Sequence, residues 1–336
     1  MVCSHSAKIV SGNSNLPLMK KMMEWIHERN INSVDLIAAE IKRFSDGEVW
    51  VEIQENVRGQ DVFVLQSTSY PANDHLMELL ITVDALKRAS ARRITAVIPY
   101  YGYARQDRKT AARTPVSAKL VSNLLRESGV DRVLTLDLHA GQIQAFFDIP
   151  CDNMYAAPIL CSAIQQTFPN LEKVTIVSPD VGGVVRARNL AKRLGVGIAI
   201  VDKRRSQPGV VDNMEIIGDV NGKICLICDD ICDTAGTLVK AADCLKEHGS
   251  IAVHAYVSHG VLSEPAVERI STSELSSFTM TDSIDASEKI KNSEKIHCLS
   301  IAPLFAQAII NVSSDNSLST LFHEKYVAPL YNSTIA

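Results

Sequence analysis

Residues 224–237 read ICLICDDICDTAGT. The apolar run Ile224–Cys228 predicts a buried strand, and the small residues of Asp233–Thr237 predict a loop that opens a helix. In open α/β sheets, ligands bind beyond the carboxyl ends of the strands. The backbone N–H groups of such a loop, together with the helix N-terminus, favour a bound phosphate. This stretch therefore predicts an α/β fold with a phosphate-binding loop.

The two carboxylates before the loop, Asp229 and Asp230, indicate a second kind of contact. Their charge repels a phosphate, but carboxylates accept hydrogen bonds from sugar hydroxyls or share a cation. Thr234 and Thr237 add hydroxyl donors to the loop. A phosphate on the loop and a diol on the acids together describe a phosphorylated ribose. The alternative is a capped helix after a strand, with incidental acids.

Short apolar runs alternate with segments of helical period along the rest of the chain, which favours parallel, doubly wound sheets. The predicted strands are 49–53, 61–66, 94–98, 132–136, 174–178, 197–201, 224–228, 251–257 and 296–300. One predicted helix has Asp74 placed to cap its start. Others end at Gly129, Gly195 and Gly249, as helix C-termini prefer.

A weak internal sequence similarity indicates two such sheets. Residues 94–102 resemble residues 174–182, and later in each half a strand ends in acids and small residues, at 136–141 and at 228–237. We therefore expect two domains, residues 1–157 and 158–311, with residues 312–336 returning to complete the first. The segment 271–295 is rich in Ser, Thr, Glu and Lys, and we expect it to be partly exposed linking structure.

Composition narrows the function classes. Of the 336 residues, 46% are apolar and 21% are charged, the ordinary balance of a globular protein, so disorder is excluded for most of the chain. No apolar run approaches the roughly 18–20 residues of a membrane span. No secretory signal is visible, so we expect a cytoplasmic protein without membrane contact. A net charge of −4 and few aromatics argue against nucleic acid and for a small charged ligand.

The eight cysteines are scattered, as expected in a reduced, intracellular compartment. Cys225, Cys228 and Cys232 have a C-x2-C-x3-C spacing. However, the first two would point to opposite faces of the predicted strand, and no paired His or second C-x2-C follows. We therefore do not expect a structural zinc.

Longer motifs, spread over roughly residues 7–325, resemble those of a known protein family. They are Arg43-Phe44-Ser45-Asp46-Gly47-Glu48, 56–59, 73–79, 101–107, 137–140, 146–150, 178–180 and 202–205, besides the loop at 233–237. With them the chain resembles the phosphate-activated class of the ribose-phosphate diphosphokinase family. The resemblance implies two type I phosphoribosyltransferase domains, each a mainly parallel sheet flanked by helices. It also implies an enzyme that transfers diphosphate from ATP to the anomeric hydroxyl of ribose 5-phosphate and releases AMP.

The resemblance further implies roles for individual residues. Lys203 and Arg205 match a catalytic loop, and the ribose 5-phosphate site matches Asp229, Asp230, Asp233, Thr234, Ala235, Gly236 and Thr237. The positions that contact ATP in the family correspond here to Phe44, Asp46, Glu48, Arg105, Gln106 and Asp107. Positions for Mg²⁺ match His139 and Asp180, with weaker matches at Asp137, Asp148 and Asp152. The site for inorganic phosphate, the activator, matches Arg58, Ser90, Arg113, Ser317 and Ser319.

The resemblance also implies self-association, of a hexamer-of-dimers type, because Phe44, Asp46 and Glu48 match a segment that reaches a neighbouring subunit's ATP site. Two departures concern the sites. Ala235 stands where the family often has Gly or Cys, and it fits only if the backbone there is right-handed, since its methyl makes positive φ costly. Asn56 stands where some members have Ser.

Two rival functions stay open at this point. One is a non-catalytic associated subunit that regulates active homologues, although the charged residues implied for catalysis are all present. The other is a phosphoribosyltransferase that consumes the activated sugar with a nucleobase, because a shared loop does not fix the function. That rival needs only one domain and leaves the stretches at 46–48 and 105–106 unexplained.

Overall fold

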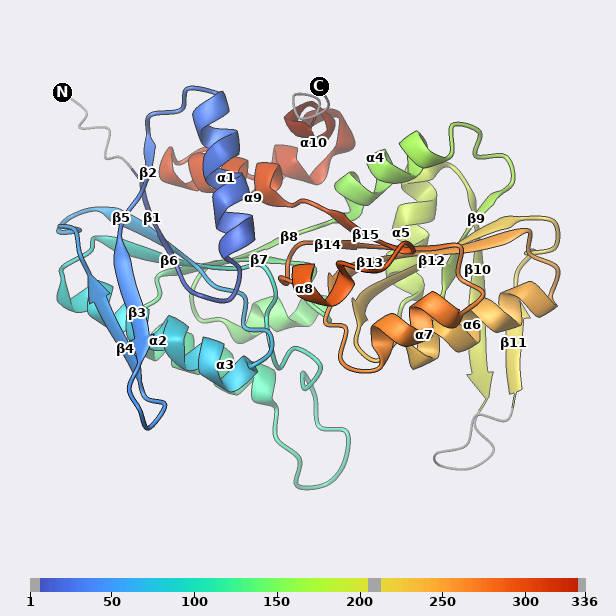
Figure 1. The fold of residues 1–336 in the computed structure, drawn as a ribbon, viewed down its shortest axis with the longest axis horizontal. Helices are drawn as coiled ribbons and strands as arrows, with labels where there is room; N and C mark the ends of the chain where they lie inside the picture. The colour runs from blue at the N-terminus through green and yellow to red at the C-terminus, as the bar shows by residue number, and fades with distance from the viewer. Residues whose placement is uncertain (1–6, 205–212, 332–336) are drawn as a thin grey trace. The chain divides into compact units, whose positions relative to one another are not determined.

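The computed structural model describes residues 7–204 and 213–331 of the chain, which form two compact units (Figure 1). Unit 1 comprises Met1–Tyr155, Ser283–Asp285 and Ser300–Ala336, and unit 2 comprises Ala156–Asp282 and Ala286–Leu299. Each unit is built on a mainly parallel sheet with helices on both faces, which confirms the fold class expected from the sequence. Within the described residues, no helix combines the length and the apolarity needed to cross a membrane.

Unit 1 is built on a six-stranded parallel sheet with the order β2-β1-β5-β6-β7-β8. These strands are β1 (Ala7–Ser11), β2 (Val34–Leu36), β5 (Asp61–Leu65), β6 (Arg93–Ile98), β7 (Arg132–Leu136) and β8 (Cys151–Met154). An antiparallel hairpin of β3 (Ala39–Arg43) and β4 (Val49–Ile53) stands beside it. Strand β5 is buried along its whole length, because helices cover both faces of the sheet.

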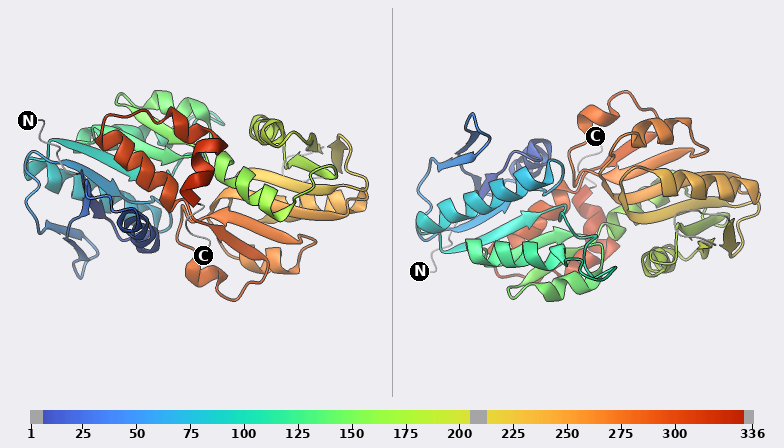
Figure 2. Two further views of the ribbon diagram at one scale, coloured as in Figure 1. Left: turned by 90° about the horizontal axis from the view of Figure 1, so that it is seen from above. Right: turned by 90° about the horizontal axis from the view of Figure 1, so that it is seen from below.

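The helices of unit 1 cover the two faces of its sheet. From above, α1 (Leu16–Glu28) and α9 (Ala302–Ser313) cover it, and from below it is covered by α2 (Ala72–Arg88) and α3 (Ser117–Ser128) (Figure 2). A last helix, α10 (Glu324–Tyr331), and short 3-10 helices at Gly141–Phe146 and Ser319–Phe322 complete the unit.

The return of the chain to unit 1 begins at residue 300, not at residue 312 as the sequence predicted. The cause is α9, which is apolar on most of its surface and packs against α1. Trp25 of α1 also donates a 3.0 Å hydrogen bond from Nε1 to the Leu330 carbonyl. Residues 300–311 therefore belong to the core of unit 1, and the expected domain of residues 158–311 is corrected accordingly.

Unit 2 has a seven-stranded sheet with the order β11-β10-β9-β12-β13-β14-β15, in which only β11 runs antiparallel to its neighbour. Its strands are β9 (Val174–Ser178), β10 (Gly197–Arg204), β11 (Asn213–Ile217), β12 (Ile224–Cys232), β13 (Ala252–Gly260), β14 (Ser277–Thr281) and β15 (Ile296–Leu299). Its helices are α4 (Ala157–Thr167), α5 (Val184–Leu194), α6 (Gly236–Glu247), α7 (Ala266–Thr272) and the single turn α8 (Ser287–Ile290). In Figure 1, α4 and α5 lie on one face of this sheet, and α6 and α7 lie on the other.

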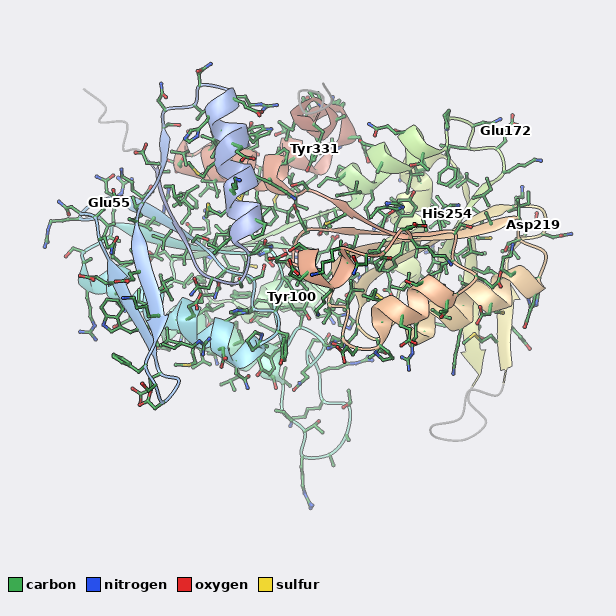
Figure 3. The ribbon with its side chains drawn as sticks, in the orientation of Figure 1. Glu55, Tyr100, Glu172, Asp219, His254 and Tyr331 are labelled. Carbon is green, nitrogen blue, oxygen red and sulfur yellow. The ribbon has the colours of Figure 1, made fainter. Side chains whose placement is uncertain are left out.

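The segment 271–295 is not linking structure, because it contains the sheet strand β14. This strand pairs with β13 and β15, and Phe278 within it is fully buried. The ring nitrogen Nδ1 of His254 on β13 lies 2.7 Å from Ser277 Oγ at the start of β14, and His254 is labelled in Figure 3. The polar residues that suggested a linker flank this short strand.

The two units share one strand order once the edge strand β11 of unit 2 is set aside. Numbered by appearance without β11, both sheets run 2-1-3-4-5-6, so β1 corresponds to β9 and β5 to β12. The prediction of two similar sheets is therefore right, but the internal sequence similarity on which it was based pairs the wrong strands. It matched the residues of β6 to those of β9 and the residues of β7 to those of β12, and these strands hold different places in the order.

Of the four helix ends predicted from the sequence, three follow their local chemistry and one does not. Gly129 and Gly195 end α3 and α5 in the left-handed conformation, and Gly249, one residue past the C-cap of α6, also has positive φ, as predicted. Asp74, however, does not cap α2, because the helix begins two residues earlier at Ala72, after Pro71. Asp74 instead forms a 3.1 Å ion pair with Arg43 at the end of β3.

Candidate active site

The residues expected to bind sugar lie at the point of unit 2 where the chain reverses its direction across the sheet. Strand β9 connects through α5 to β10 on one side, whereas β12 connects through α6 to β13 on the other side. The two strands are hydrogen-bonded neighbours, with Ile227 opposite Val177. Ligands of open α/β sheets bind in the crevice at this switch point, beyond the carboxyl ends of the strands. Asp180 follows the end of β9, and Asp229 and Asp230 lie near the end of β12.

The loop after β12 joins the strand directly to α6. The Cys232 carbonyl accepts the N–H groups of Val261 and Leu262, which holds the end of β12 next to the end of β13. Arg269 of α7 donates from Nη1 to the Thr234 carbonyl over 3.0 Å. The helix then begins at Gly236, and its N-terminal N–H groups supply positive potential at this end of the loop.

Ala235 adopts the left-handed conformation, with φ of 60° and ψ of 0°. The sequence-based condition that the backbone there be right-handed is therefore wrong. A non-glycine residue pays roughly 1–2 kcal/mol in this region, which surrounding structure must offset. The buried Ala235 side chain packs in the apolar core of unit 2, and its carbonyl accepts the Val239 N–H at 3.0 Å.

The acid pair is held by an arginine that the sequence analysis did not identify. Arg186 of α5 donates from Nη1 to Asp229 Oδ1 at 3.2 Å, and the same nitrogen lies 3.1 Å from Asp230 Oδ1. The Asp230 side chain is only 5% exposed, and those of Asp229 and Arg186 are 22% and 27% exposed. Asp229 Oδ1 also accepts the backbone N–H of Asp230 at 2.9 Å.

Burial and, next, the neighbouring charge of Asp230 raise the pKa of Asp229 to about 7. The Arg186 cation opposes both effects, since it favours the ionised carboxylate. The pKa of Asp229 thus lies near neutrality, which is unusual for an aspartate and is common at functional sites.

Asp180 occupies the other side of the switch point, in the turn before α5. Its Oδ1 accepts the Gly183 N–H at 3.0 Å, and its carbonyl accepts the Ser178 hydroxyl at 2.6 Å. A side chain at Gly183 would place its Cβ 2.9 Å from Ser178 Oγ, so the serine hydroxyl would have to shift. Unit 2 therefore brings Asp180, Asp229 and Asp230 to one edge of its sheet.

The residues expected to contact ATP lie in unit 1, on two separate loops. Arg105, Gln106 and Asp107 follow β6, where the Ser117 hydroxyl donates to Gln106 Oε1 at 2.6 Å and the Gln142 amide donates to Asp107 Oδ2 at 3.0 Å. The loop is anchored at Gly102, whose N–H donates to Thr68 Oγ1 at 2.7 Å and where an added Cβ would collide with the Thr68 carbonyl.

The second of these loops is the tip of the β3–β4 hairpin. Phe44 there is 55% exposed, so its ring is open to contact from outside unit 1. The Glu48 N–H donates to Asp46 Oδ1 at 3.1 Å, which orders the tip. These contacts leave the ring and both acids on the surface of unit 1.

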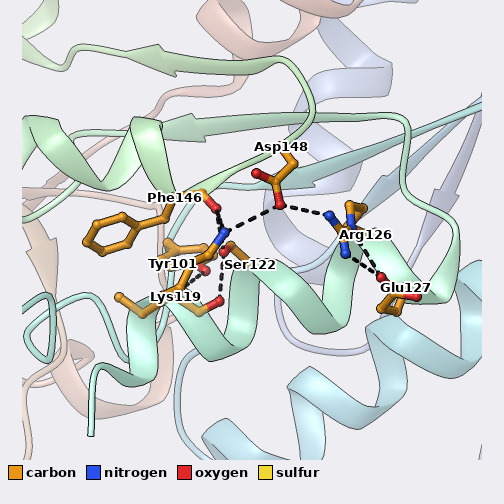
Figure 4. Close-up of polar contacts among 8 residues, drawn as sticks. Tyr101, Lys119, Ser122, Arg126, Glu127, Phe146 and Asp148 are labelled. Carbon is orange, nitrogen blue, oxygen red and sulfur yellow. Dashed lines mark hydrogen bonds and ion pairs between the residues drawn. The ribbon is translucent and has the colours of Figure 1, made fainter.

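The five residues expected near Mg²⁺ are divided between the two units. His139 is exposed in the loop after β7, in unit 1, whereas Asp180 belongs to unit 2. Asp148 forms ion pairs with Arg126 at 2.8 Å and Lys119 at 3.4 Å (Figure 4), and Asp152 pairs with Arg132. Asp137 has a positive φ of 37° at the end of β7. Over residues 7–204 and 213–331, no three His, Cys, Asp or Glu side chains group to hold a metal.

The residues expected to bind the phosphate activator form two pairs in unit 1. Arg58 donates from Nη1 to Ser90 Oγ at 3.1 Å, and the hydroxyls of Ser317 and Ser319 lie 2.8 Å apart. Arg113 is exposed and has a positive φ of 64°. Of the two residues expected in the catalytic loop, Lys203 lies opposite Met214 in the β10–β11 pairing, and Arg205 lies outside the described residues.

Comparison with known proteins agrees with this geometry. A family model for the N-terminal domain of ribose phosphate pyrophosphokinase matches residues 7–129, and a model for the phosphoribosyl synthetase-associated domain matches residues 204–323. The ribose-phosphate pyrophosphokinase of Cereibacter sphaeroides is 55% identical over 325 residues, which cover 96% of this chain and 97% of the relative. That of Hyphomonas neptunium is 57% identical over 316 residues, which cover 94% and 99%. The chain belongs to the ribose-phosphate pyrophosphokinase family.

A solved structure of this family supports the fold of both units. A crystal structure of phosphoribosylpyrophosphate synthetase from Mycobacterium smegmatis aligns with a TM-score of 0.86 and 39% identity, over 93% of this chain and all of that one. The family resemblance drawn from the sequence is therefore confirmed, as is the expectation of an enzyme.

Arg186 and Arg269 are the residues at the site that the sequence analysis missed. Both stand on helices that follow strands of unit 2, at the start of α5 and within α7. A signal existed for Arg186, because a buried acid pair requires a nearby cation and this arginine lies in the first turn after the Asp180 motif. Arg269 carries no such signal, since its contact is to a backbone carbonyl.

Proposed function

We propose that this chain transfers the diphosphate group of ATP to the anomeric hydroxyl of ribose 5-phosphate, giving 5-phosphoribosyl 1-diphosphate and AMP. The observation that carries the proposal is the acid pair Asp229–Asp230 directly before a small-residue loop at the switch point of unit 2. The loop suits the 5-phosphate and the acids suit the ribose hydroxyls. The family to which the chain belongs supports the same reaction.

The sugar is positioned by groups of different chemistry on the two sides of the loop. The N–H groups of Asp233–Thr237 and the hydroxyls of Thr234 and Thr237 hold the 5-phosphate, next to the N-terminus of α6. Asp229 and Asp230 accept hydrogen bonds from the sugar hydroxyls. The anomeric oxygen then attacks the β-phosphorus of ATP in line, and the protein contributes chiefly position and charge neutralisation.

ATP is bound by Arg105, Gln106 and Asp107 of one subunit, with Phe44, Asp46 and Glu48 supplied by a neighbouring subunit. The exposed Phe44 ring at a hairpin tip supports this arrangement, because a partner would cover it. Aromatic stacking on adenine and acids for its amino group account for the three residue types. The site is then complete only in an assembly, which we expect to be of a hexamer-of-dimers type.

Mg²⁺ is the cofactor of the proposed reaction, and the residues present fit it. Mg²⁺ in nucleotide sites is held by one or two carboxylates together with the substrate's phosphates, so no cage of protein ligands is required. Asp180, at the edge of the sheet in unit 2, and His139 and Asp137 in unit 1 would serve this role. Asp148 and Asp152 fit less well, since basic side chains already neutralise them. When bound, the ion neutralises the charge of the transferred diphosphate.

Lys203 and Arg205 supply the cations that stabilise negative charge as it shifts to the departing AMP. Inorganic phosphate activates through Arg58, Ser90, Arg113, Ser317 and Ser319. The hydrogen bond between Arg58 and Ser90 and the close pair of Ser317 and Ser319 hydroxyls support donors at this place.

The test is an assay of AMP formation by the chain purified alone, with ATP, Mg²⁺ and phosphate present. We expect AMP to form only when ribose 5-phosphate is added. AMP formation at the background rate in the presence of all components would reject the proposal and would favour a regulatory subunit. Release of diphosphate that depends on an added nucleobase would favour a phosphoribosyltransferase instead.

A further inference from the structure

We infer that Arg186 is a positioning residue for the sugar site, which acts through the acid pair Asp229–Asp230 and not through the phosphates. This inference rests on the proposed function and assigns a role to a residue outside the loops described above. Its basis is the geometry of one nitrogen atom. Arg186 Nη1 lies 3.2 Å from Asp229 Oδ1 and 3.1 Å from Asp230 Oδ1, so one guanidinium nitrogen bridges the two carboxylates.

The contact of Arg186 with both carboxylates fixes the orientation of the two acids. A guanidinium nitrogen of this kind carries two N–H groups, one for each carboxylate, and Arg stays charged at every pH at which the protein is folded. Because Arg186 engages Oδ1 of both acids, the carboxylate planes cannot rotate independently. Sugar hydroxyls then meet acceptors that are already oriented, which lowers the entropy lost on binding.

The bridge also settles the charge of the pair. Two aspartates this close, one of them almost fully buried, repel each other and tend to share a proton. Without the cation, burial and mutual repulsion would leave one acid protonated at neutral pH, and a protonated acid is a poorer acceptor for a sugar hydroxyl. Arg186 opposes this change, because its positive charge lowers the pKa of Asp229.

The place of Arg186 in the fold supports a role in the site rather than in folding. It is in the first turn of α5, the helix that leaves the switch point from β9, and its side chain is 27% exposed. The core face of α5 is made by other residues, Ala187, Leu190, Ala191 and Leu194. A change at position 186 therefore leaves the packing of the helix intact.

The experiment compares Arg186→Ala with the matched control Arg188→Ala, an exposed arginine on the same helix. For Arg186→Ala we expect the KM for ribose 5-phosphate to rise at least about tenfold, the effect of losing a charge-assisted contact. We expect the KM for ATP and the thermal unfolding temperature to match those of Arg188→Ala. Arg186→Lys should restore part of the affinity, because it keeps the charge but has different geometry.

A double-mutant cycle with Asp229→Asn separates an action through the acids from a direct contact with substrate. If Arg186 acts through the pair, Arg186→Ala adds little to the loss already caused by Asp229→Asn. Additive losses, or a loss in kcat with an unchanged KM for ribose 5-phosphate, would overturn the inference. A failure of the proposed function is distinguishable, because the wild-type chain would then form no AMP in response to ribose 5-phosphate.

Discussion

Glu78 accepts a 2.8 Å hydrogen bond from the side-chain amide of Gln66, between the carboxyl ends of β1 and β5 in unit 1. Glu78 also accepts the backbone N–H of Asn13 at 2.6 Å and the Asn13 amide at 3.1 Å. By strand order this is the counterpart of the switch point that carries Asp229 and Asp230 in unit 2. In unit 1 the crevice is closed by a buried carboxylate and its donors, and Gly12 leaves no room for a Cβ beside them.

Replacing this carboxylate should lower the stability of unit 1. In Glu78→Gln, an amide donor faces the donors of Asn13 and Gln66, so buried N–H groups lose their acceptor. We expect the free energy of unfolding to fall by about 1–3 kcal/mol. Urea unfolding measures the change, with the exposed Glu24→Gln on α1 as the control. Equal stability of the two variants would show that the network contributes nothing.

Substitutions at Ala235 should separate backbone strain from packing. In Ala235→Gly, relief of the left-handed strain, about 1–2 kcal/mol, is offset by the lost methyl burial and the greater freedom of the unfolded chain. We therefore expect its stability to lie within about 1 kcal/mol of the wild type. Ala235→Val should lose about 2 kcal/mol or more, since a β-branched residue is poorly tolerated there and the site is 5% exposed. Thermal unfolding of both variants decides between these outcomes, and a stable Ala235→Val would contradict the left-handed geometry.

The acid pair predicts a pH dependence in the neutral range. The pKa of Asp229 is raised to about 7, first by burial and then by Asp230, so the carboxyl gains a proton as the pH falls through neutrality. We expect kcat/KM for ribose 5-phosphate to decrease by up to about tenfold per pH unit below this range. In Asp229→Asn the low activity should not follow this profile. A wild-type profile that is flat down to pH 5 would contradict the assignment.

The same group has a defined effect on stability. Its pKa is higher in the folded chain than the ordinary 3.8, so the folded state binds the proton more tightly than the unfolded state does. Unfolding therefore releases a proton between these values, and the Asp229 contribution to stability falls as the pH rises from about 4 to about 7. Asp229→Asn should remove this contribution, as urea unfolding at both pH values would show.

Lys203→Ala tests the catalytic loop. We expect kcat to fall on the order of a hundredfold, with little change in the KM for ribose 5-phosphate, because the cation acts on charge that develops during the reaction. Steady-state kinetics beside Lys192→Ala, an exposed lysine on α5, give the comparison. Equal rates for the two variants would disprove the role of Lys203 even if the activity itself is present.

Removal of divalent metal should abolish activity without unfolding the chain. The described residues contain no group of three metal-ligating side chains, so we do not expect a metal to stabilise the fold. EDTA is expected to stop AMP formation and to shift the unfolding temperature by no more than about 2 °C. Added Mg²⁺ should restore the rate, and activity that persists in excess EDTA would contradict the proposed cofactor.

The sequence predicted those parts of the fold whose signals are local. The apolar run of β12, the small-residue loop and the glycines that end α3 and α5 each carry their own cue. Strand β14 was missed because its short apolar core is surrounded by polar residues, and only its pairing with β13 and β15 makes it a strand. Packing of α9 on α1 moved the expected domain boundary for the same reason.

The candidate site was predictable where chemistry is concentrated in one motif. Asp229 and Asp230 precede the loop in sequence, so their proximity follows from the chain itself. Arg186 lies far from them along the chain and meets them only through the adjacent positions of β9 and β12. The left-handed state of Ala235 also depends on tertiary structure, because an alanine alone does not favour it.

Unit 1 starts with the first strands of the chain and is closed by its last helices, and this has a consequence for synthesis on the ribosome. The chain emerges from its N-terminus, so α1 is made long before α9, the helix on which its buried side chains rest. All strands of unit 2 have been synthesised once Leu299 has emerged. Unit 1 at that point still lacks the segment that begins at Ser300. The unit that is translated first is thus the unit that is finished last, and a chain cut short before Ser300 would lack α9, the helix that packs against α1.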